Sequence, residues 1–558
     1  MIEFLFLAVI AILAIAASAV LGPKLGVAAP LVLVAVGVAA SFLPVFADTH
    51  IDPEWILQGV LPPLLYSSAV SMPAMNFRRD FGAIGGLSVL LVVASALLLG
   101  VFFMLVIPDL GFAWGVALGA IISPTDAVAT SIIKKTPVSK RVVTILDGES
   151  LLNDATALVL LRTAIVATAA GFAFWGALGT FVYSVVVAVV VGVAVGRVDL
   201  AIRRRVTDPT VNTVLSFTVP FVASVPAELL GGSGLVAAVV AGLITGISAP
   251  RVLSPETRLS DTQNWRAVEL VLEGAVFLTM GVQIKEIVTH VQDDHAGVAA
   301  TLLIALGALA LTLVIRAAYV APLLGLLERW SRRNEKLQPI LQDWQERLET
   351  PEGKDQAFGK VHHFRRRRGS PRDLERFSLR VTRGLADIDY LMREQLGWRE
   401  GVAVVWAGMR GAVTVAAAQT LPDDAPYRST LVLIAFAVAI LSLLVQGGTI
   451  GPLLDRLGTK ADDAEAAEQT AAQTAEIMKL LRTSAETVPP VPKFGDQPPS
   501  KEAFVAAKRQ RLAVLAAQRT ALLDARDNGT FDADILSEAL ADLDATHIAT
   551  QMHGEFAR

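Results

Sequence analysis

Long apolar segments separated by short polar loops dominate this chain. Crossing a hydrocarbon core about 30 Å thick takes roughly 20 apolar residues of helix, and on that basis the pattern predicts about 13 membrane spans. Apolar runs such as 185–191 lack the alternation of a membrane β-barrel strand, so the predicted fold is all-α and polytopic. The expected spans are residues 2–21, 26–46, 55–72, 81–107, 111–133, 142–169, 171–196, 211–230, 234–247, 268–282, 298–327, 401–421 and 430–454.

Two densely charged segments stand apart from this apolar pattern. Residues 328–398 are predicted to be a cytoplasmic insertion and residues 459–558 a cytoplasmic helical tail, which leaves 1–327 and 399–457 as the transmembrane domain. The first span carries Glu3 where a signal peptide would carry basic residues, so we expect it to be retained.

Lys and Arg gather in alternate short loops, and loops of this kind face the cytoplasm. The opposite loops hold little positive charge beyond Lys285 and Arg428 and are acidic, for example at Asp293 and Asp294. With an odd number of spans, the N-terminus lies outside and the C-terminus inside the plasma or inner membrane. The basic loop residues are Lys24, Arg78, Arg79, Lys134, Lys135, Lys140, Arg141, Arg197, Arg203, Arg204, Arg205, Arg251 and Arg258.

Composition excludes several classes of protein. Of the 558 residues, 53% are hydrophobic and 18% charged, against about 25% charged in a soluble protein. The 48 basic and 52 acidic residues give a net charge of −4, so no nucleic-acid partner is expected. Without cysteine there is no disulfide, thiolate metal site or cysteine nucleophile. No catalytic or nucleotide-binding pattern is present, and we expect a transporter rather than an enzyme.

Two predicted spans, 111–133 and 401–421, combine a charge with residues that break helices. Proline removes a backbone donor and clashes with the preceding turn, and glycine weakens a helix. Interrupted helices with charges at the breaks are typical of the binding sites of transporters. The breaks fall in the middle spans of two triplets that start on opposite sides of the membrane, as inverted repeats require. A kinked structural helix is the alternative, but the charge at each break favours function. The two runs are Ser123-Pro124-Thr125-Asp126 and Gly408-Met409-Arg410-Gly411.

Carboxylates concentrate in span 142–169. Asp147, Ser150 and Asp154 share one helix face at spacings of three and four residues. A charge at mid-membrane costs about 2.5–3.5 kcal/mol, which makes it a candidate functional residue. An isolated buried carboxylate holds either a proton or a cation, and the competition between them is the chemistry of exchange. Asp154 is the deepest acid of this span.

A structural salt bridge is the alternative role for such an acid. Arg316 or Arg410 would be the partner, and this accounts for one of Asp126, Glu149 and Asp154 but not for all three. Two further acids, Glu269 and Glu273, are predicted nearer an end of their span.

Five runs, in this order, resemble the monovalent cation–proton antiporter superfamily, in the branch of bacterial NhaP-type and animal NHE sodium/proton exchangers. The resemblance covers roughly residues 1–457. The runs are Leu61-Pro62-Pro63-Leu64-Leu65-Tyr66, Ser123-Pro124-Thr125-Asp126-Ala127-Val128, Gly148-Glu149-Ser150-Leu151-Leu152-Asn153-Asp154, Gly408-Met409-Arg410-Gly411-Ala412-Val413 and Val445-Gln446-Gly447-Gly448-Thr449-Ile450.

This resemblance implies a homodimer whose protomers move by an elevator-type alternating access. It implies a core domain, residues 81–169 and 298–454, and a dimerisation domain, residues 1–72 and 171–282. Transported Na⁺ and H⁺ are then substrates, and no cofactor or structural metal is expected.

The resemblance also assigns roles to individual residues. Asp154 is the ion- and proton-binding carboxylate, and Ser150, Asp126 and the Thr125 backbone help to coordinate the ion. Asn153 stands where electrogenic relatives have a second aspartate, which suggests electroneutral exchange. The expected salt bridge joins Glu149 to Arg316. We assign Arg410 to neutralising the helix-end dipoles at its break.

One departure from the family concerns the third span. Some relatives have an acid just after the Pro-Pro pair, where this chain has Tyr66-Ser67-Ser68. Either water or a serine then completes the coordination, or affinity and selectivity differ. Arg162, two turns beyond Asp154, pairs with an acid or reaches the outer interface and has no assigned role.

The charged segments suggest two further features. Arg365–Arg368 form a basic cluster that either binds anionic lipid headgroups or is a solvated loop. In the tail, Pro489-Pro490 and Pro498-Pro499 mark a linker, and 501–550 is predicted to form a helical hairpin that turns at Asn528-Gly529.

The predicted function is exchange of cytoplasmic Na⁺, and of Li⁺, for external protons, in the service of pH homeostasis. A K⁺/H⁺ antiporter of the same fold is the main alternative. A cation channel is a further alternative, but its selectivity filter would need a ring of pore-loop carbonyls or of acidic side chains, and neither is evident in the sequence. A membrane-bound sensor is another, and its function would reside in the C-terminal tail.

Overall fold

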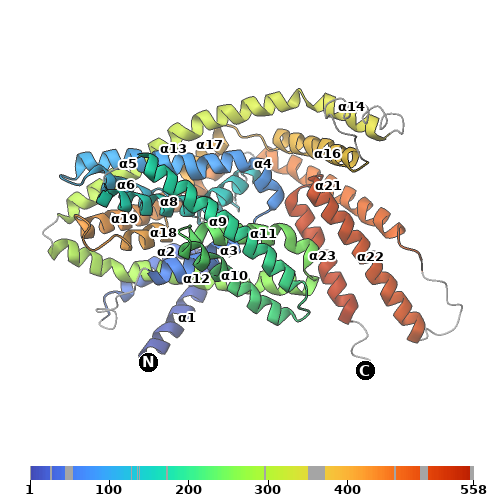
Figure 1. Ribbon diagram of the computed structural model, residues 1–558, viewed down its shortest axis with the longest axis horizontal. Helices are drawn as coiled ribbons and strands as arrows, with labels where there is room; N and C mark the ends of the chain where they lie inside the picture. Colours follow the sequence, from blue (N-terminus) through green and yellow to red (C-terminus); the bar gives the residue numbers. More distant parts are fainter. Residues whose placement is uncertain are drawn as a thin grey trace. The chain divides into compact units, whose positions relative to one another are not determined.

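A computed structural model describes residues 2–25, 28–43, 54–126, 128–134, 136, 138–170, 174–293, 297–349, 371–457, 460–490 and 501–552. Every regular element within these residues is a helix (Figure 1). Eight of these helices are long and apolar enough to cross a membrane, and three shorter apolar helices accompany them. The predicted all-α membrane fold is therefore confirmed, whereas the count of 13 spans stays a prediction.

The chain divides into two compact units, and the first comprises Met1–Leu253, Thr257–Leu324 and Gly397–Gly458. Its helices are α1 (Ile2–Leu25), α2 (Ala29–Ala40), η2 (Trp55–Val60), α3 (Leu61–Ser71), α4 (Ala74–Gly85), η3 (Gly86–Leu91), α5 (Val92–Val106), α6 (Phe112–Ile122), α7 (Val128–Ile133), α8 (Lys140–Ala170), α9 (Phe174–Arg203), α10 (Pro209–Leu229), α11 (Gly234–Val252), most of α12 (Pro255–Asp293), the first part of α13 (Val298–Glu335), α17 (Trp398–Trp406), α18 (Ala412–Gln419), α19 (Arg428–Ser442), η4 (Leu443–Gly447) and α20 (Gly448–Leu457).

Both predicted helix breaks are present. The helix before Pro124 ends at Ile122 and the chain becomes helical again at Val128. In the other span, α17 ends at Trp406 and α18 begins at Ala412. Because Pro cannot donate a backbone hydrogen bond and Gly favours non-helical conformations, both interruptions lie where the sequence predicts them.

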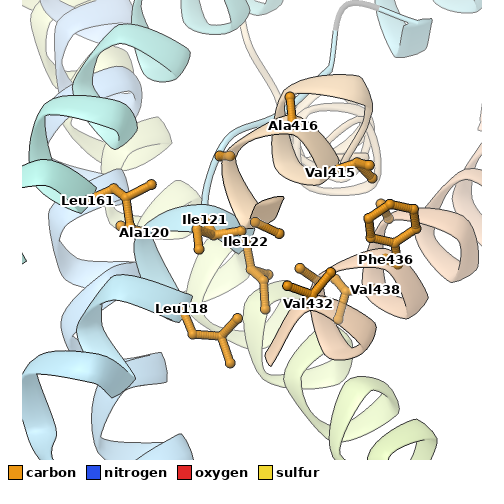
Figure 2. Close-up of a cluster of buried hydrophobic side chains, with 14 of the residues drawn as sticks. Leu118, Ala120, Ile121, Ile122, Leu161, Val415, Ala416, Val432, Phe436 and Val438 are labelled. Atoms are coloured by element: carbon orange, nitrogen blue, oxygen red, sulfur yellow. The ribbon is translucent and has the colours of Figure 1, made fainter. Parts of the chain in front are cut away.

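A continuous apolar core surrounds these breaks. Figure 2 shows part of it, where Ile121 and Ile122 at the end of α6 lie among side chains of α18 and α19 such as Val415 and Val432. Leu161 of α8 belongs to the same cluster. The broken helices are thus held on a well-packed frame, which fixes the backbone of the break residues.

Small residues let helix backbones approach closely. A side chain at Gly115 or Gly119 of α6 would strike the carbonyl oxygens of Gly100 and Ala96 on α5. Small residues four apart are the usual signature of tight helix pairs in membranes. The pairs α9–α11, α3–α11 and α2–α12 approach in the same way, at Gly192 and Gly196, at Gly242 and Gly246, and at Gly37 and Gly281.

Several helices extend beyond their predicted spans. The largest correction concerns α12, where the prediction began at residue 268 and the helix begins at Pro255. Glu269 and Glu273 therefore lie well inside this helix and not near its end. The polar residues of 256–266 hid the continuation, because hydropathy marks contact with lipid and not the limits of a helix. Likewise α13 continues to Glu335, into the predicted insertion.

The second unit comprises Ser254–Glu256, Gly325–Leu396 and Thr459–Arg558, so the insertion and the tail fold together. The insertion contributes α14 (Gln338–Glu349) and α16 (Pro371–Arg393), which pack through Leu348, Val381 and their neighbours. The tail contributes α21 (Lys460–Glu486), α22 (Lys501–Asn528) and α23 (Ala533–Met552), which share a core around Leu522 and Leu536.

The predicted hairpin of the tail is confirmed, and Gly529 makes the turn with a φ of 73°. A third helix of the tail, α21, precedes this hairpin; the predicted helical tail includes its residues but gave the helix no bounds of its own. The Arg365–Arg368 cluster lies outside the described residues, as do the second proline pair and Ala127.

Candidate functional site

The two helix breaks meet. The backbone N–H of Asp126 donates to the carbonyl oxygen of Met409 at 2.7 Å, which joins one break directly to the other. The Arg410 guanidinium makes a second link, from the second break back to the first, because its Nε donates to the carbonyl oxygen of Ile122 at 3.0 Å. Carbonyls and amides that a continuous helix would use internally are therefore satisfied between the breaks.

Asp126 links two helix beginnings. Its Oδ1 accepts from the backbone N–H of Val128 at 3.2 Å, and its Oδ2 accepts from that of Ala412 at 3.4 Å. These residues are the first of α7 and of α18. Backbone N–H groups at a helix start favour a negative charge, so the Asp126 carboxylate is held by both helices.

A buried polar network ties α8 to the first break. The Asn153 Nδ2 donates to Thr125 Oγ1 at 2.6 Å and to the Thr125 carbonyl at 3.4 Å. The Thr125 hydroxyl donates in turn to Glu149 Oε1 at 3.3 Å. Arg316 of α13 binds the same carboxylate in a fork, with Nη2 to Glu149 Oε2 at 2.7 Å and a second contact from Nη1 to Oε1. The pair that the resemblance implied is thus present and buried.

The two arginines also bind carbonyls that the breaks leave free. The Arg316 Nε donates to Val404 of α17 at 2.9 Å. Arg410 reaches the last carbonyl of α6 and also that of Gly408. Its own backbone N–H donates to the Ser442 hydroxyl at 2.9 Å. Arg410 therefore lies at the negative end of a helix, where a cation is stabilised.

Asp154 differs from the other acids of α8. Asp147 pairs with Lys134 at 3.0 Å, and Glu149 pairs with Arg316, whereas no described residue donates a hydrogen bond to Asp154. Its side chain is buried, with 8% of the residue exposed. The carboxylate of Asp126 lies close enough to interact with it electrostatically. A buried carboxylate without a protein partner, beside a second carboxylate, suits a proton or a cation.

Further oxygen atoms accompany Asp154 on α8. Asn153 Oδ1 is buried and, within the described part of the chain, has no hydrogen-bond partner. Ser150 lies one turn before Asp154 and is half-buried. Hard cations are bound by carboxylate, carbonyl and hydroxyl oxygens, so this set fits a small cation as a transported substrate.

One serine of the third span, Ser67, contacts α12. The Ser67 hydroxyl donates to Glu269 Oε2 of α12 at 3.3 Å. Tyr66 packs on Trp265, with ring centroids 5.2 Å apart, and donates to Thr245. The hydroxyl of Ser67 is therefore engaged by Glu269, and completion of the ion's coordination by water or by a serine stays a prediction. Glu273, one turn beyond Glu269, interacts electrostatically with Asp126.

Sequence reasoning missed the ion pairs of two buried arginines. Asp80 Oδ1 accepts from Arg141 Nε at 2.7 Å, although Arg141 was counted as a loop residue. Arg203 binds both Asp199 and Asp261, and its Nε donates to the Asn212 side chain. A local pattern could not find Asp80 or Asp261, since 61 and 58 positions separate them from Arg141 and Arg203, whereas Asp199 lies one helical turn before Arg203.

Gly411 provides a direct test of this geometry. A methyl group there would overlap the Asp126 carboxylate. We expect Gly411→Ala to displace Asp126 and to reduce ion exchange by about tenfold, because preorganised sites tolerate only about 0.5 Å of displacement. Gly448→Ala is the matched control, since a methyl group there meets open space. Exchange in reconstituted vesicles measures both, and equal activities would contradict the assigned packing.

Comparison with known proteins identifies the family. A family model described as "Sodium/hydrogen exchanger, transmembrane" matches residues 8–342 and 377–456. The chain belongs to this family. The resemblance that the sequence motifs indicated is thereby confirmed. Residues 343–376, which include the connection between α14 and α16, and the tail beyond residue 456 lie outside the family match.

Similar exchangers include proteins of several bacteria. An uncharacterized Na⁺/H⁺ exchanger of Mycobacterium tuberculosis is 27% identical over 578 residues, covering 97% of this chain and 95% of its own. A sodium, potassium, lithium and rubidium/H⁺ antiporter of Bacillus pumilus is 29% identical over 304 residues, covering 52% and 45%. These relatives are named as transporters and not as enzymes.

The fold of this exchanger also has a solved counterpart. The sodium proton antiporter MjNhaP1 of Methanocaldococcus jannaschii matches 82% of this chain and 100% of its own, with a TM-score of 0.57 and 16% identity. At that identity the match supports the fold alone. Together with the family match, it makes this chain a multi-pass membrane protein that exchanges cations for protons.

Proposed function

We propose that this protein is a secondary antiporter that exports Na⁺, and also Li⁺, in exchange for H⁺, with Asp154 as the carboxylate that binds the two ions in turn. The observation that carries the proposal is the buried Asp154, which lacks a protein donor where the two helix breaks meet. Every other acid of α8 and the breaks already has a partner.

Competition at one carboxylate couples the two ions. A cation binds the ionised Asp154, and a proton neutralises the group and displaces the cation, so both cannot be held together. We propose that Ser150, Thr125 and Asn153 line the cation, with Asp126 adding negative charge beside it. Since Asn153 is a neutral amide hydrogen-bonded to Thr125, one site carboxylate changes protonation per cycle, and exchange is electroneutral.

Alternating access requires that Asp154 face one side of the membrane at a time. We propose an elevator in which a core domain, residues 81–169 and 298–454, moves against a dimerisation domain, residues 1–72 and 171–282. The links between α6, α8, α13 and α17 support a core that moves as one body.

The remaining features of the proposal come from the sequence pattern and the resemblance. They are thirteen spans with inverted repeats, a homodimer, an outer N-terminus, and a cytoplasmic insertion (328–398) and tail (459–558) that lie near membrane lipid. The compact second unit formed by these two segments supports a common location for them. No cofactor takes part, because the ions themselves are the substrates.

K⁺ is the main alternative substrate. The Bacillus pumilus relative is named for sodium, potassium, lithium and rubidium, and the oxygen ligands proposed here do not discriminate by charge between alkali cations.

Cation-induced dequenching of a pH-sensitive dye in inverted vesicles tests the proposal. We expect Na⁺ and Li⁺ to release a respiration-generated proton gradient, and K⁺ to release little of it. Vesicles from cells without the protein are the control. A response to K⁺ equal to that for Na⁺ would favour the alternative substrate, and no response to any of the three cations would refute antiport.

A further inference from the structure

Arg162 has no place in the ion site, yet it forms an ion pair with a second helix. Its Nη2 lies 3.2 Å from Glu228 Oε1, which joins α8 to the end of α10. The side chains are 59% and 30% exposed, so the pair is accessible and is not part of the packed core.

Arg162 moves with the candidate ion-binding residue. Both side chains belong to α8, a continuous helix from Lys140 to Ala170. Arg162 follows Asp154 by eight residues, which at 1.5 Å per residue is about 12 Å along the helix axis. Any displacement of Asp154 along the membrane normal therefore displaces Arg162 as well.

Glu228 lies at the turn from α10 to α11, residues 228–234, which we call the corner and which is hydrogen-bonded to its neighbours. The chain turns between α10 and α11, where Gly232 N–H donates to Ala227 at 2.7 Å and Ser233 N–H donates to Ser184 of α9 at 3.3 Å. A side chain at Gly234 would strike the Glu228 side chain, so these two residues are packed together. The corner ties α9, α10 and α11 into one body.

We propose that the Arg162–Glu228 ion pair is a latch that holds the α8 body against the α9–α11 body in one end state of the transport cycle. The inference rests on the proposed elevator, in which α8 belongs to the moving domain and α9–α11 to the other. In the proposed orientation the latch lies on the outer side of Asp154.

The energetics suit a latch that must open in every cycle. An exposed ion pair shifts an equilibrium by no more than about fivefold, so thermal motion opens it readily. A shift by one helical turn is about 5.4 Å, which this 3.2 Å contact cannot span in its present geometry. The latch thus biases the populations of the end states without trapping either one.

Neutralisation tests the latch through non-additivity. We expect Arg162→Gln and Glu228→Gln each to change the exchange rate at saturating Na⁺ by about twofold to fivefold in the same direction, the range that such a pair supports. The double variant should change it no further, and Arg162→Glu with Glu228→Arg should return it toward wild type. Asp423→Asn is the matched control, because it breaks an exposed pair with Arg428 that lies within the proposed core.

Cross-linking tests the motion itself. The chain has no cysteine, so Arg162→Cys with Glu228→Cys creates one thiol pair. A bifunctional reagent that forms a disulfide with each cysteine, and whose spacer is as long as the combined Arg162 and Glu228 side chains, should stop exchange. A reductant that cleaves these disulfides should restore exchange. Each single-cysteine variant should have the same exchange rate before and after treatment with the reagent.

The outcomes separate the latch from the proposed function. Unchanged rates in both neutralised variants, or full exchange after cross-linking, would overturn the latch and leave the antiporter intact. Absence of exchange in untreated wild type would refute the proposed function. In that case the cross-linking yield would test the latch by itself. A yield that changes with Na⁺ would support a moving contact, and a constant, complete yield would overturn the latch.

Discussion

We expect Asp154→Asn to abolish exchange of Na⁺ for H⁺, down to the level of vesicles without the protein. Asparagine has almost the same shape but cannot take up and release a proton, and it lacks the charge that binds a cation. Because no described residue donates a hydrogen bond to Asp154, the substitution breaks no hydrogen bond within the described part of the chain. The protein should therefore be made, inserted and folded as before, which size-exclusion chromatography of detergent-solubilised protein checks.

Thermal stability provides a second readout that does not depend on transport. A cation that binds the folded state stabilises it by about 2.7 kcal/mol when present at 100 times its Kd. We expect Na⁺ to raise the melting temperature of wild type and not that of Asp154→Asn. The matched control is Asp147→Asn, two turns earlier on the same helix face, where the acid is already paired with Lys134. Normal exchange by Asp154→Asn, or its loss in both variants alike, would contradict the site.

The sequence was sufficient to predict the two helix breaks of the candidate site because the signals for them are local. Pro124 and the glycines at 408 and 411 interrupt helices wherever they stand, and the structure places both interruptions there. An acid such as Asp154, with apolar residues on either side, is costly in a membrane and therefore conspicuous. These two features, together with the family motifs, predict that the ion site lies near Asp154 and the two helix breaks.

The sequence was not sufficient to give the partners of each charge, because those depend on helix packing. Asp126 was expected to be an ion ligand, and the sequence did not show that its two oxygens also accept backbone N–H groups that start α7 and α18. A serine of the third span was one option for the ion site, and the contact of Ser67 with Glu269, on a helix that hydropathy had cut short, was not foreseen. Arg162 had no role until the structure placed Glu228 beside it.

The Glu149–Arg316 pair leads to a different expectation, which concerns stability. Both side chains are buried and the fork between them is complete, so Glu149→Ala leaves an arginine without its counter-charge. Breaking a buried pair by removing one partner lowers the free energy of unfolding by about 3–5 kcal/mol. This loss is a large share of the total stability of a typical protein, so less of the variant would accumulate in the membrane. We expect expression and melting temperature to fall at least as much as transport.

Replacing both partners distinguishes this structural role from a direct role at the ion. Glu149→Leu combined with Arg316→Met removes the unpaired charge, and such exchanges are often neutral or stabilising, so the double variant should regain part of the lost stability. Glu328→Ala, which breaks the exposed pair with Arg332, is the control and should cost no more than about 0.5 kcal/mol. If Glu149→Ala instead melts like wild type but does not transport, Glu149 acts on the ion. Thr125, whose hydroxyl donates to Glu149, would then connect Glu149 to the ion-binding residues.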